Sequence, residues 1–216
     1  MGKLILGIDE AGRGPVIGPM VIAGYCIKEE KMDKLIDTGV KDSKELTRKE
    51  REDIYKKIIE ISDKYKYIII DPKTIDYYVY KNKLNYLEFE NMIKIIKDIK
   101  PDKVIIDSPL RDTKKVVEYF KNNLNENIEI VAENKADKNY PVVSAASIIA
   151  KVNRDWEIDK IKEKLNIDFG SGYPSDERTI KAIKEDYDKL KDYIRESWFT
   201  IKKIKSGKQK NIADFL

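Results

Sequence analysis

The sequence of 216 residues contains no histidine. Histidine is the usual general base at neutral pH and the commonest ligand of transition metals. Its absence excludes Ser-His-Asp triads and histidine-rich zinc sites. If the protein performs hydrolytic chemistry, aspartate and glutamate must carry it, and clustered carboxylates without imidazole or thiolate favour hard ions such as Mg²⁺ or Mn²⁺.

The sequence also has a single cysteine and no long apolar run. Cys26 lies in an apolar stretch, which predicts a small core residue and neither a nucleophile nor half of a disulfide. No segment approaches the ~18 apolar residues that a membrane-spanning helix requires, and the N-terminus lacks the pattern of a signal peptide. We therefore expect a cytoplasmic protein without membrane contact. Nothing in the sequence demands a partner subunit, so a monomer is expected.

Length and charge limit the organisation of the chain. With 41% hydrophobic residues, 216 residues suffice for one well-buried core. Charged residues make up 38% of the sequence, and 43 Lys+Arg against 39 Asp+Glu leave a net charge of +4, which permits binding to a polyanion without demonstrating it. We expect one domain over residues 1–204 and a flexible basic tail over residues 205–216.

Apolar segments and helical spacing predict alternating strands and helices. A capping box at Thr47 and Glu50 predicts a helix start, and the small residues Ala145, Ala146 and Ser147 predict a helix that packs closely on a sheet. The pattern predicts an α/β fold in which helices flank a mixed sheet. Strands are expected near 4–8, 16–27, 67–70, 104–106 and 128–132, and helices near 47–62, 84–99, 113–123, 141 onwards, 175–190 and 194–204.

The strongest chemical signal is a pair of acids, Asp9 and Glu10, at the end of the first apolar strand. Adjacent strand residues point to opposite faces, so both acids share one site only if the chain leaves regular geometry there. Gly12 and Gly14, on both sides of Arg13, permit such a bend. The alternative is a capped turn with solvated acids.

Two further acids, Asp107 and Asp137, occupy similar places. Asp107 directly follows the apolar run 104–106, and Asp137 precedes the small-residue helix. Either one alone would be read as a surface or capping aspartate, but ligand sites in open α/β sheets form at strand ends. Together the three carboxylate positions favour a shared metal site, in which four carboxylates hold two divalent ions ~3.5–4 Å apart.

These motifs resemble the type 2 ribonucleases H (ribonuclease HII) in the form found in archaea. The resemblance extends from residue 7 to about residue 176, and it implies the ribonuclease H fold with a five-stranded sheet and extra C-terminal helices. The segments that carry it are Gly7 to Pro15, Lys41-Asp42-Ser43-Lys44, Asp107-Ser108-Pro109, Ala136-Asp137, Pro141 to Lys151 and Ser171-Gly172-Tyr173-Pro174-Ser175.

The resemblance implies an endoribonuclease that cuts the RNA strand of RNA/DNA hybrids and nicks duplex DNA 5′ of single ribonucleotides. The products would be 5′-phosphate and 3′-hydroxyl ends, in ribonucleotide and primer removal during DNA replication and repair. The implied catalytic acids, which would bind two Mg²⁺ or Mn²⁺ ions, are Asp9, Glu10, Asp107 and Asp137. Gly12, Arg13 and Gly14 would contact the nucleotide whose 2′-OH is tested. Tyr173 would pack on the next sugar, and Lys44 would contact a phosphate.

The C-terminal residues resemble a peptide that docks on sliding-clamp proteins. Gln209 is the only glutamine, Ile212 follows three residues later, and the chain ends on the apolar pair Phe215 and Leu216. Such a peptide inserts apolar anchors into a pocket, and basic flanking residues assist the encounter. The alternative is a frayed terminus.

Two other functions stay open from the residues themselves. One is a different two-metal phosphoryl enzyme, such as a junction or DNA endonuclease, because acids alone do not set the substrate. The other is a clamp or nucleic-acid adaptor that kept the fold without the chemistry. The Gly-Arg-Gly turn and Tyr173 separate the first from a ribonuclease, and the presence of all four acids argues against the second.

Overall fold

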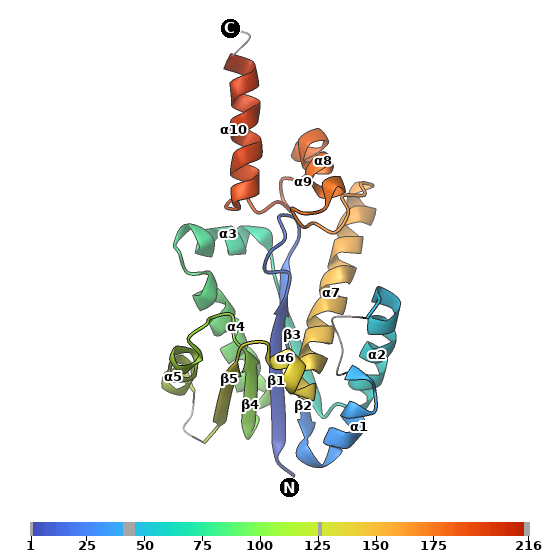
Figure 1. The fold of residues 1–216 in the computed structure, drawn as a ribbon, viewed down its shortest axis with the longest axis vertical. Helices are drawn as coiled ribbons and strands as arrows, with labels where there is room; N and C mark the ends of the chain where they lie inside the picture. The colour runs from blue at the N-terminus through green and yellow to red at the C-terminus, as the bar shows by residue number, and fades with distance from the viewer. Residues whose placement is uncertain (1, 41–45, 125–126, 214–216) are drawn as a thin grey trace. The chain divides into compact units, whose positions relative to one another are not determined.

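The computed structural model describes residues 2–40, 46–124 and 127–213 (Figure 1). The chain forms two compact units. The first unit comprises Met1–Ala11, Val21–Ile69 and Asn85–Asn153, and the second comprises Gly12–Met20, Ile70–Leu84 and Arg154–Leu216. Within the described residues, no helix combines the length and the apolar character needed to cross a membrane.

The first unit is built on a five-stranded mixed sheet. Its strands are β1 (Leu4–Ala11), β2 (Met20–Lys28), β3 (Lys64–Ile70), β4 (Lys103–Asp107) and β5 (Glu129–Glu133), in the order β3-β2-β1-β4-β5. β1 pairs antiparallel with β2 and parallel with β4, and β4 pairs parallel with β5. The predicted α/β fold with a mixed five-stranded sheet is confirmed.

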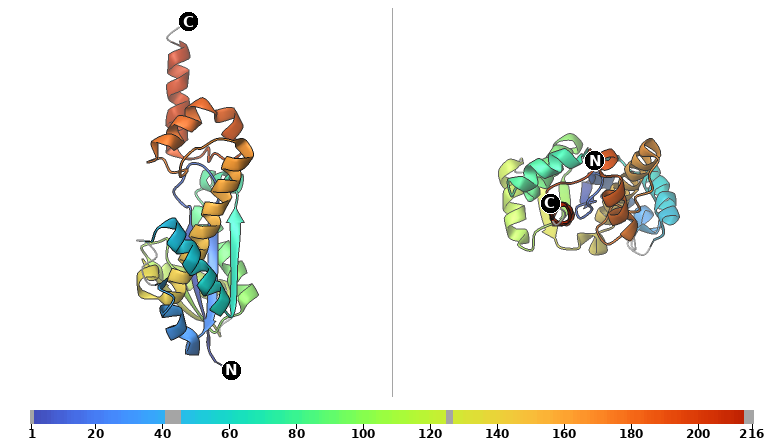
Figure 2. Two further views of the ribbon diagram at one scale, coloured as in Figure 1. Left: turned by 90° about the vertical axis from the view of Figure 1, so that its right-hand side faces the viewer. Right: turned by 90° about the horizontal axis from the view of Figure 1, so that it is seen from above.

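Helices cover both faces of this sheet. α4 and α5 lie on one face, and α1, α2 and the first half of α7 lie on the other (Figure 1; Figure 2, left). The helices associated with the first unit are α1 (Met32–Ile36), α2 (Arg48–Ile61), α4 (Leu84–Ile99), α5 (Thr113–Asn123), α6 (Ala136–Asn139) and α7 (Pro141–Leu165), with a 3₁₀ turn η1 (Glu29–Lys31). The second unit holds α3 (Pro72–Tyr80), the end of α7, α8 (Glu177–Glu185), α9 (Tyr187–Leu190) and α10 (Phe199–Ala213).

Local capping explains where two of these helices begin. At the start of α2, the Thr47 hydroxyl accepts from Glu50 N, and the Glu50 carboxylate accepts from Thr47 N at 2.7 Å, so the predicted capping box is confirmed. α3 was not predicted, although its signals are present. Asp71 caps the helix by accepting from Thr74 N at 2.9 Å, and Pro72 occupies its first turn.

The C-terminal helices differ from the prediction at their ends. The single helix expected over 175–190 is divided into α8 and α9, and the helix expected from residue 194 begins at Phe199 and continues to Ala213. The late start has a tertiary cause, because the backbone amides of Glu196 and Ser197 donate to the Asp76 carboxylate. The backbone of residues 205–213, where we expected a tail, continues this helix.

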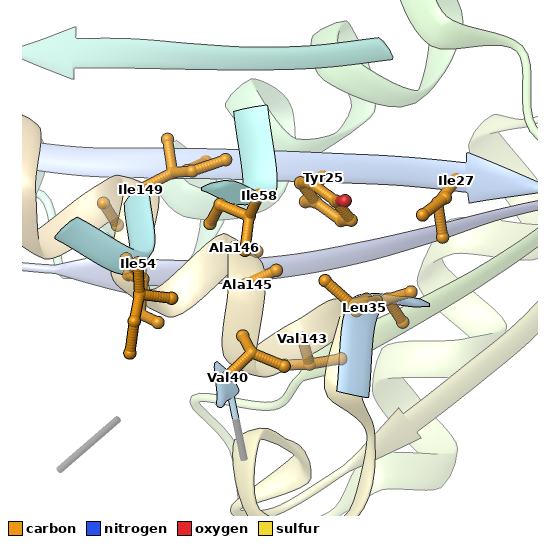
Figure 3. Close-up of a cluster of buried hydrophobic side chains, with 14 of the residues drawn as sticks. Tyr25, Ile27, Leu35, Val40, Ile54, Ile58, Val143, Ala145, Ala146 and Ile149 are labelled. Carbon is orange, nitrogen blue, oxygen red and sulfur yellow. The ribbon is translucent and has the colours of Figure 1, made fainter. Parts of the chain in front are cut away.

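The main core of the first unit lies between the sheet and helices α2 and α7. Ala145 and Ala146 of α7 are fully buried beside Ile58 of α2 and Tyr25 of β2 (Figure 3). Their small side chains let α7 approach the sheet, as predicted. At Gly7 of β1 the approach is closest, because an added Cβ would lie 2.2 Å from the Val142 carbonyl carbon.

Replacement of Gly7 by alanine should therefore destabilise the first unit. The new methyl group would overlap the backbone of α7, and such overpacking costs about 1–3 kcal/mol in the free energy of unfolding. Urea denaturation of Gly7→Ala measures the loss. The matched control is Gly2→Ala, whose added Cβ meets only the flexible end of Glu30. Equal stability of the two variants would contradict the close packing at Gly7.

Candidate functional site

Three acidic side chains from different elements meet in the first unit. Asp9 of β1, Asp107 of β4 and Asp137 of α6 each offer a carboxylate oxygen, and these oxygens lie within 4.8 Å of one another. Parallel pairing of Ile8 with Ile106 places Asp9 and Asp107 toward the same, carboxyl-terminal end of these two strands. Asp9 and Asp137 are buried, whereas Asp107 is partly exposed. The three acids therefore converge, two of them from strands and Asp137 from a short helix.

The turn between β5 and α6 positions two of these carboxylates. The Ala136 amide, next to Asp137, donates to Asp107 Oδ1 at 3.2 Å. Asn134 donates through its side-chain amide to the carbonyl oxygens of Ser108 at 3.1 Å and Leu110 at 2.7 Å, which ties the end of β5 to the loop after β4. Sequence analysis missed Asn134, because an asparagine in a polar turn gives no signal of a tertiary role.

A bound cation would relieve the electrostatic repulsion within this cluster. Burial and, second, the charge of Asp107 raise the pKa of Asp9 to about 7. The nearby Ser147 hydroxyl, the Glu10 amide at 2.7 Å from Asp9 Oδ1, and the charge of Lys151 oppose this increase in pKa. In the ionised state the carboxylates need a positive counter-charge. An all-oxygen donor set with this charge fits Mg²⁺ or Mn²⁺.

Glu10, the fourth predicted acid, lies next to this cluster in the chain but is not one of its three members. β1 remains a regular strand through both acids, in which Asp9 pairs with Ala23 and Glu10 with Ile22. The expected departure from strand geometry comes later, at Gly12, whose φ is +83°. The assignment of Glu10 to the metal site therefore stays a prediction.

The predicted glycine turn and Tyr173 belong to the second unit, where they lie close together. A Cβ added at Gly14 would lie 3.7 Å from Tyr173 Cε1. The Arg154 guanidinium carbon lies 5.0 Å from the centroid of the Tyr173 ring, and Arg154 Nη2 donates to the Ser171 carbonyl at 3.0 Å. The Tyr173 side chain is 38% exposed, so part of its ring is open to a ligand.

Backbone hydrogen bonds to Gly172 hold the segment 171–173 against the residues that follow the glycine turn. The Gly172 carbonyl accepts from Val16 N at 2.8 Å and Ile17 N at 3.1 Å. Gly172 has φ of +79°, and an added Cβ would lie 2.7 Å from the Ile17 carbonyl oxygen, so only glycine suits this position. The second unit therefore places the exposed Gly14 beside Tyr173, whereas Gly12 is buried and Arg13 is partly buried.

Sequence analysis also missed Arg195, which is fully buried in the second unit. It donates to carbonyl oxygens of Gly12, Arg13 and Gly18 at 2.6–3.0 Å. One arginine among 43 basic residues gives no sequence signal of burial.

Several predicted residues lie outside the described part of the chain. Lys44 falls in the segment 41–45, and Phe215 and Leu216 fall at the C-terminus. The structure describes the backbone of Gln209 and Ile212 as part of α10, and their side chains lie outside the description. The phosphate contact and the clamp peptide stay predictions.

The chain is similar to known proteins over nearly its whole length. A family model for Ribonuclease HII matches residues 6–201. The Ribonuclease HII of Pyrococcus horikoshii is 44% identical over 212 residues, covering 96% of this chain and 95% of the relative. A crystal structure of the ribonuclease H2 from Pyrococcus horikoshii OT3 matches with a TM-score of 0.88 at 44% identity, covering 96% of this chain and 99% of that chain. A structure of the PCNA:RNase HII complex from Archaeoglobus fulgidus matches with a TM-score of 0.83 at 38% identity, covering 90% of this chain and 95% of that chain.

The raised pKa of Asp9 predicts how pH affects the metal-free protein. The folded state keeps the proton up to about pH 7, whereas the unfolded chain releases it near ~4. The free energy of unfolding should therefore fall as pH rises between these values and level off above them. Added Mg²⁺ or Mn²⁺ should raise the melting temperature more at pH 8 than at pH 5.5, because a cation replaces the proton.

Asp9→Asn tests this account directly. At pH 8 the metal-free variant should be more stable than the parent by about 1–3 kcal/mol, and it should lose most of its response to divalent ions. The control is Asp53→Asn, which removes an exposed carboxylate of α2. Thermal unfolding with and without metal measures both effects. A full metal response in Asp9→Asn would exclude Asp9 as a ligand.

Proposed function

The chain belongs to the ribonuclease HII family, a family of metal-dependent endoribonucleases that act on RNA/DNA hybrids, and from this premise we propose that it also nicks duplex DNA 5′ of single ribonucleotides by two-metal-ion catalysis. The family membership confirms the resemblance of its motifs and the ribonuclease H fold. The proposed products are 5′-phosphate and 3′-hydroxyl ends, and the proposed role is ribonucleotide and primer removal in replication and repair.

The observation that carries the proposal is the meeting of Asp9, Asp107 and Asp137 within 4.8 Å. These side chains would hold divalent ions, and Glu10 is proposed as the fourth acid. When bound, such ions neutralise charge at the scissile phosphate and promote ionisation of the attacking water. The protein fixes the direction of attack, because its ligands come from the rigid ends of β1 and β4 and from α6.

The second unit would select the nucleotide. Gly12 follows Asp9 by three residues, so covalent connection alone keeps their Cα atoms within about 11 Å. The backbone of Gly12, Arg13 and Gly14 is proposed to contact the nucleotide that carries the 2′-OH, because glycine permits a close approach. Tyr173 is proposed to pack on the next sugar and favour deoxyribose there. Lys44 is proposed to contact a phosphate.

A nicking assay tests the activity. The substrate is a DNA duplex with one ribonucleotide, and the control is the same duplex without it. With Mg²⁺ or Mn²⁺ we expect a single cut 5′ of the ribonucleotide and no cut in the all-DNA duplex, because only the former offers the 2′-OH. Equal cleavage of both would favour a DNA endonuclease and contradict the proposal.

Substitution of the acids distinguishes an enzyme from an adaptor. Asp9→Asn and Asp137→Asn should lower kcat at least a hundredfold, because each removes a proposed ligand of the ions that stabilise the transition state. Binding to the hybrid should persist. Glu10→Gln should show the same loss if Glu10 is the fourth acid. Asp53→Asn is the control and should keep full turnover, and parental turnover in Asp9→Asn would exclude its catalytic role.

We further propose that the C-terminal peptide binds a sliding clamp. The support comes from Gln209, Ile212, Phe215 and Leu216 in the sequence and from a relative, 38% identical, whose structure is a PCNA:RNase HII complex. Residues before the peptide are rich in lysine, which assists encounter with an acidic partner.

Deletion of residues 209–216 should abolish clamp binding and leave cleavage of a short duplex unchanged. Phe215→Ala should weaken binding at least tenfold, because an apolar anchor is lost. Asn211→Ala, which changes no proposed anchor, is the matched control. Calorimetric titration with the clamp of the same organism measures the affinities. Undiminished binding by the deleted protein would place the clamp contact elsewhere.

A further inference from the structure

A buried arginine supports the glycine turn of the second unit. Arg195 is fully buried, and its hydrogen-bond partners are carbonyl oxygens. Nη2 donates to Gly12 O at 2.6 Å, Nη1 donates to Arg13 O at 3.0 Å, and Nε and Nη2 donate to Gly18 O at 3.0 and 2.9 Å. One guanidinium thus spans both ends of the segment 12–18.

Trp198 extends this support to the third residue of the turn. Its indole Nε1 donates to Gly14 O at 3.1 Å. Its ring centroid lies 5.0 Å from the Arg195 guanidinium carbon, which is the distance of a cation–π contact. The carbonyl oxygens of Gly12, Arg13 and Gly14 therefore all accept hydrogen bonds from the segment 195–198.

The segment 195–198 is itself held in place. Asp76 of α3 is buried, and its carboxylate accepts from Glu196 N at 2.8 Å and from Ser197 N at 2.9 Å. The Arg195 amide donates to Val16 O at 2.9 Å. The residues that hold the glycine turn are thus themselves held by hydrogen bonds.

We propose that Arg195 is a positioning residue for ribonucleotide recognition, which presets the backbone of residues 12–14 in the shape that tests the 2′-OH. The inference rests on the proposed function of this turn. Glycine has the largest backbone freedom of any residue, and a turn that fluctuates contacts a hydroxyl group poorly. Bonds from Arg195 and Trp198 remove that freedom before the substrate arrives.

The chemistry of arginine suits this task. A planar guanidinium offers five donors in a fixed arrangement, whereas lysine offers a single ammonium group. Four of the Arg195 hydrogen bonds reach three carbonyl groups, so Arg195→Lys keeps the charge and leaves some of these acceptors unsatisfied. The positive charge behind the turn would also favour an approaching phosphate.

The test compares two substrates on three variants. Steady-state assays give KM and kcat for the single-ribonucleotide duplex, and competition by an all-DNA duplex gives its inhibition constant. For Arg195→Lys we expect KM to rise about tenfold, with the inhibition constant unchanged within twofold. Trp198→Phe keeps an aromatic ring and loses the Nε1 donor, so its KM should rise about threefold. Arg48→Lys on exposed α2 is the matched control and should resemble the parent.

Folding and metal binding are monitored in the same variants. Stabilisation by Mn²⁺ should stay at the parental value in Arg195→Lys, because the carboxylate cluster belongs to the first unit. A KM within twofold of the parent would overturn the inference. It would also be overturned if KM, the inhibition constant and the Mn²⁺ response deteriorated together, since that result indicates a purely structural arginine.

Failure of the proposed function gives a different result. In that case the parental protein itself would not distinguish the two duplexes, and the inference about Arg195 would fall with it. A parent that prefers the ribonucleotide, together with an unaffected Arg195→Lys, would overturn only the role of Arg195.

Discussion

Repulsion among three carboxylates is the constraint around which the first unit is arranged. Asp9, Asp107 and Asp137 offer oxygens within 4.8 Å of one another, and two of these residues are buried. Like charges in such surroundings oppose folding, so other interactions must hold them there. The parallel pairing of β1 with β4, and the close approach of α7 at Gly7, provide that support. The excess negative charge fits cations that prefer oxygen ligands.

The second unit contains a buried positive charge, in contrast to the clustered negative charges of the first. Arg195 is a buried cation whose hydrogen bonds go to neutral carbonyl oxygens, and burial lowers its pKa. Charge-assisted bonds of this kind are among the stronger ones in proteins, and they compensate for lost hydration. Their consequence is a glycine turn with a defined shape, in which Gly12 adopts a positive φ.

The proposed function gives catalysis and substrate selection to different parts of the chain. The acids are carried by strand ends and α6, and substitutions there change the charge available to divalent ions. The groups proposed to recognise the nucleotide are backbone atoms of a turn and the side chain of one tyrosine. A substitution does not remove backbone atoms, so it affects them only through the side chains that hold the turn. If the proposed function holds, separate supports explain how one fold combines a chemistry common to many phosphoryl enzymes with the proposed selectivity for ribonucleotides.

The sequence by itself determined the α/β class, the five strands, the small-residue helix and the identity of the candidate acids, because periodicity, capping and composition are local properties. It also contains the local signals for α3, the capping Asp71 and Pro72 in the first turn, although that helix was not predicted. Only the tertiary structure decided that Asp9, Asp107 and Asp137 meet while Glu10 lies outside their group, that α10 begins at Phe199, and that Arg195 is buried behind the glycine turn. These outcomes depend on strand pairing and on hydrogen bonds between residues far apart in the chain, such as the 183 positions from Arg195 to Gly12, and no local pattern encodes such pairing.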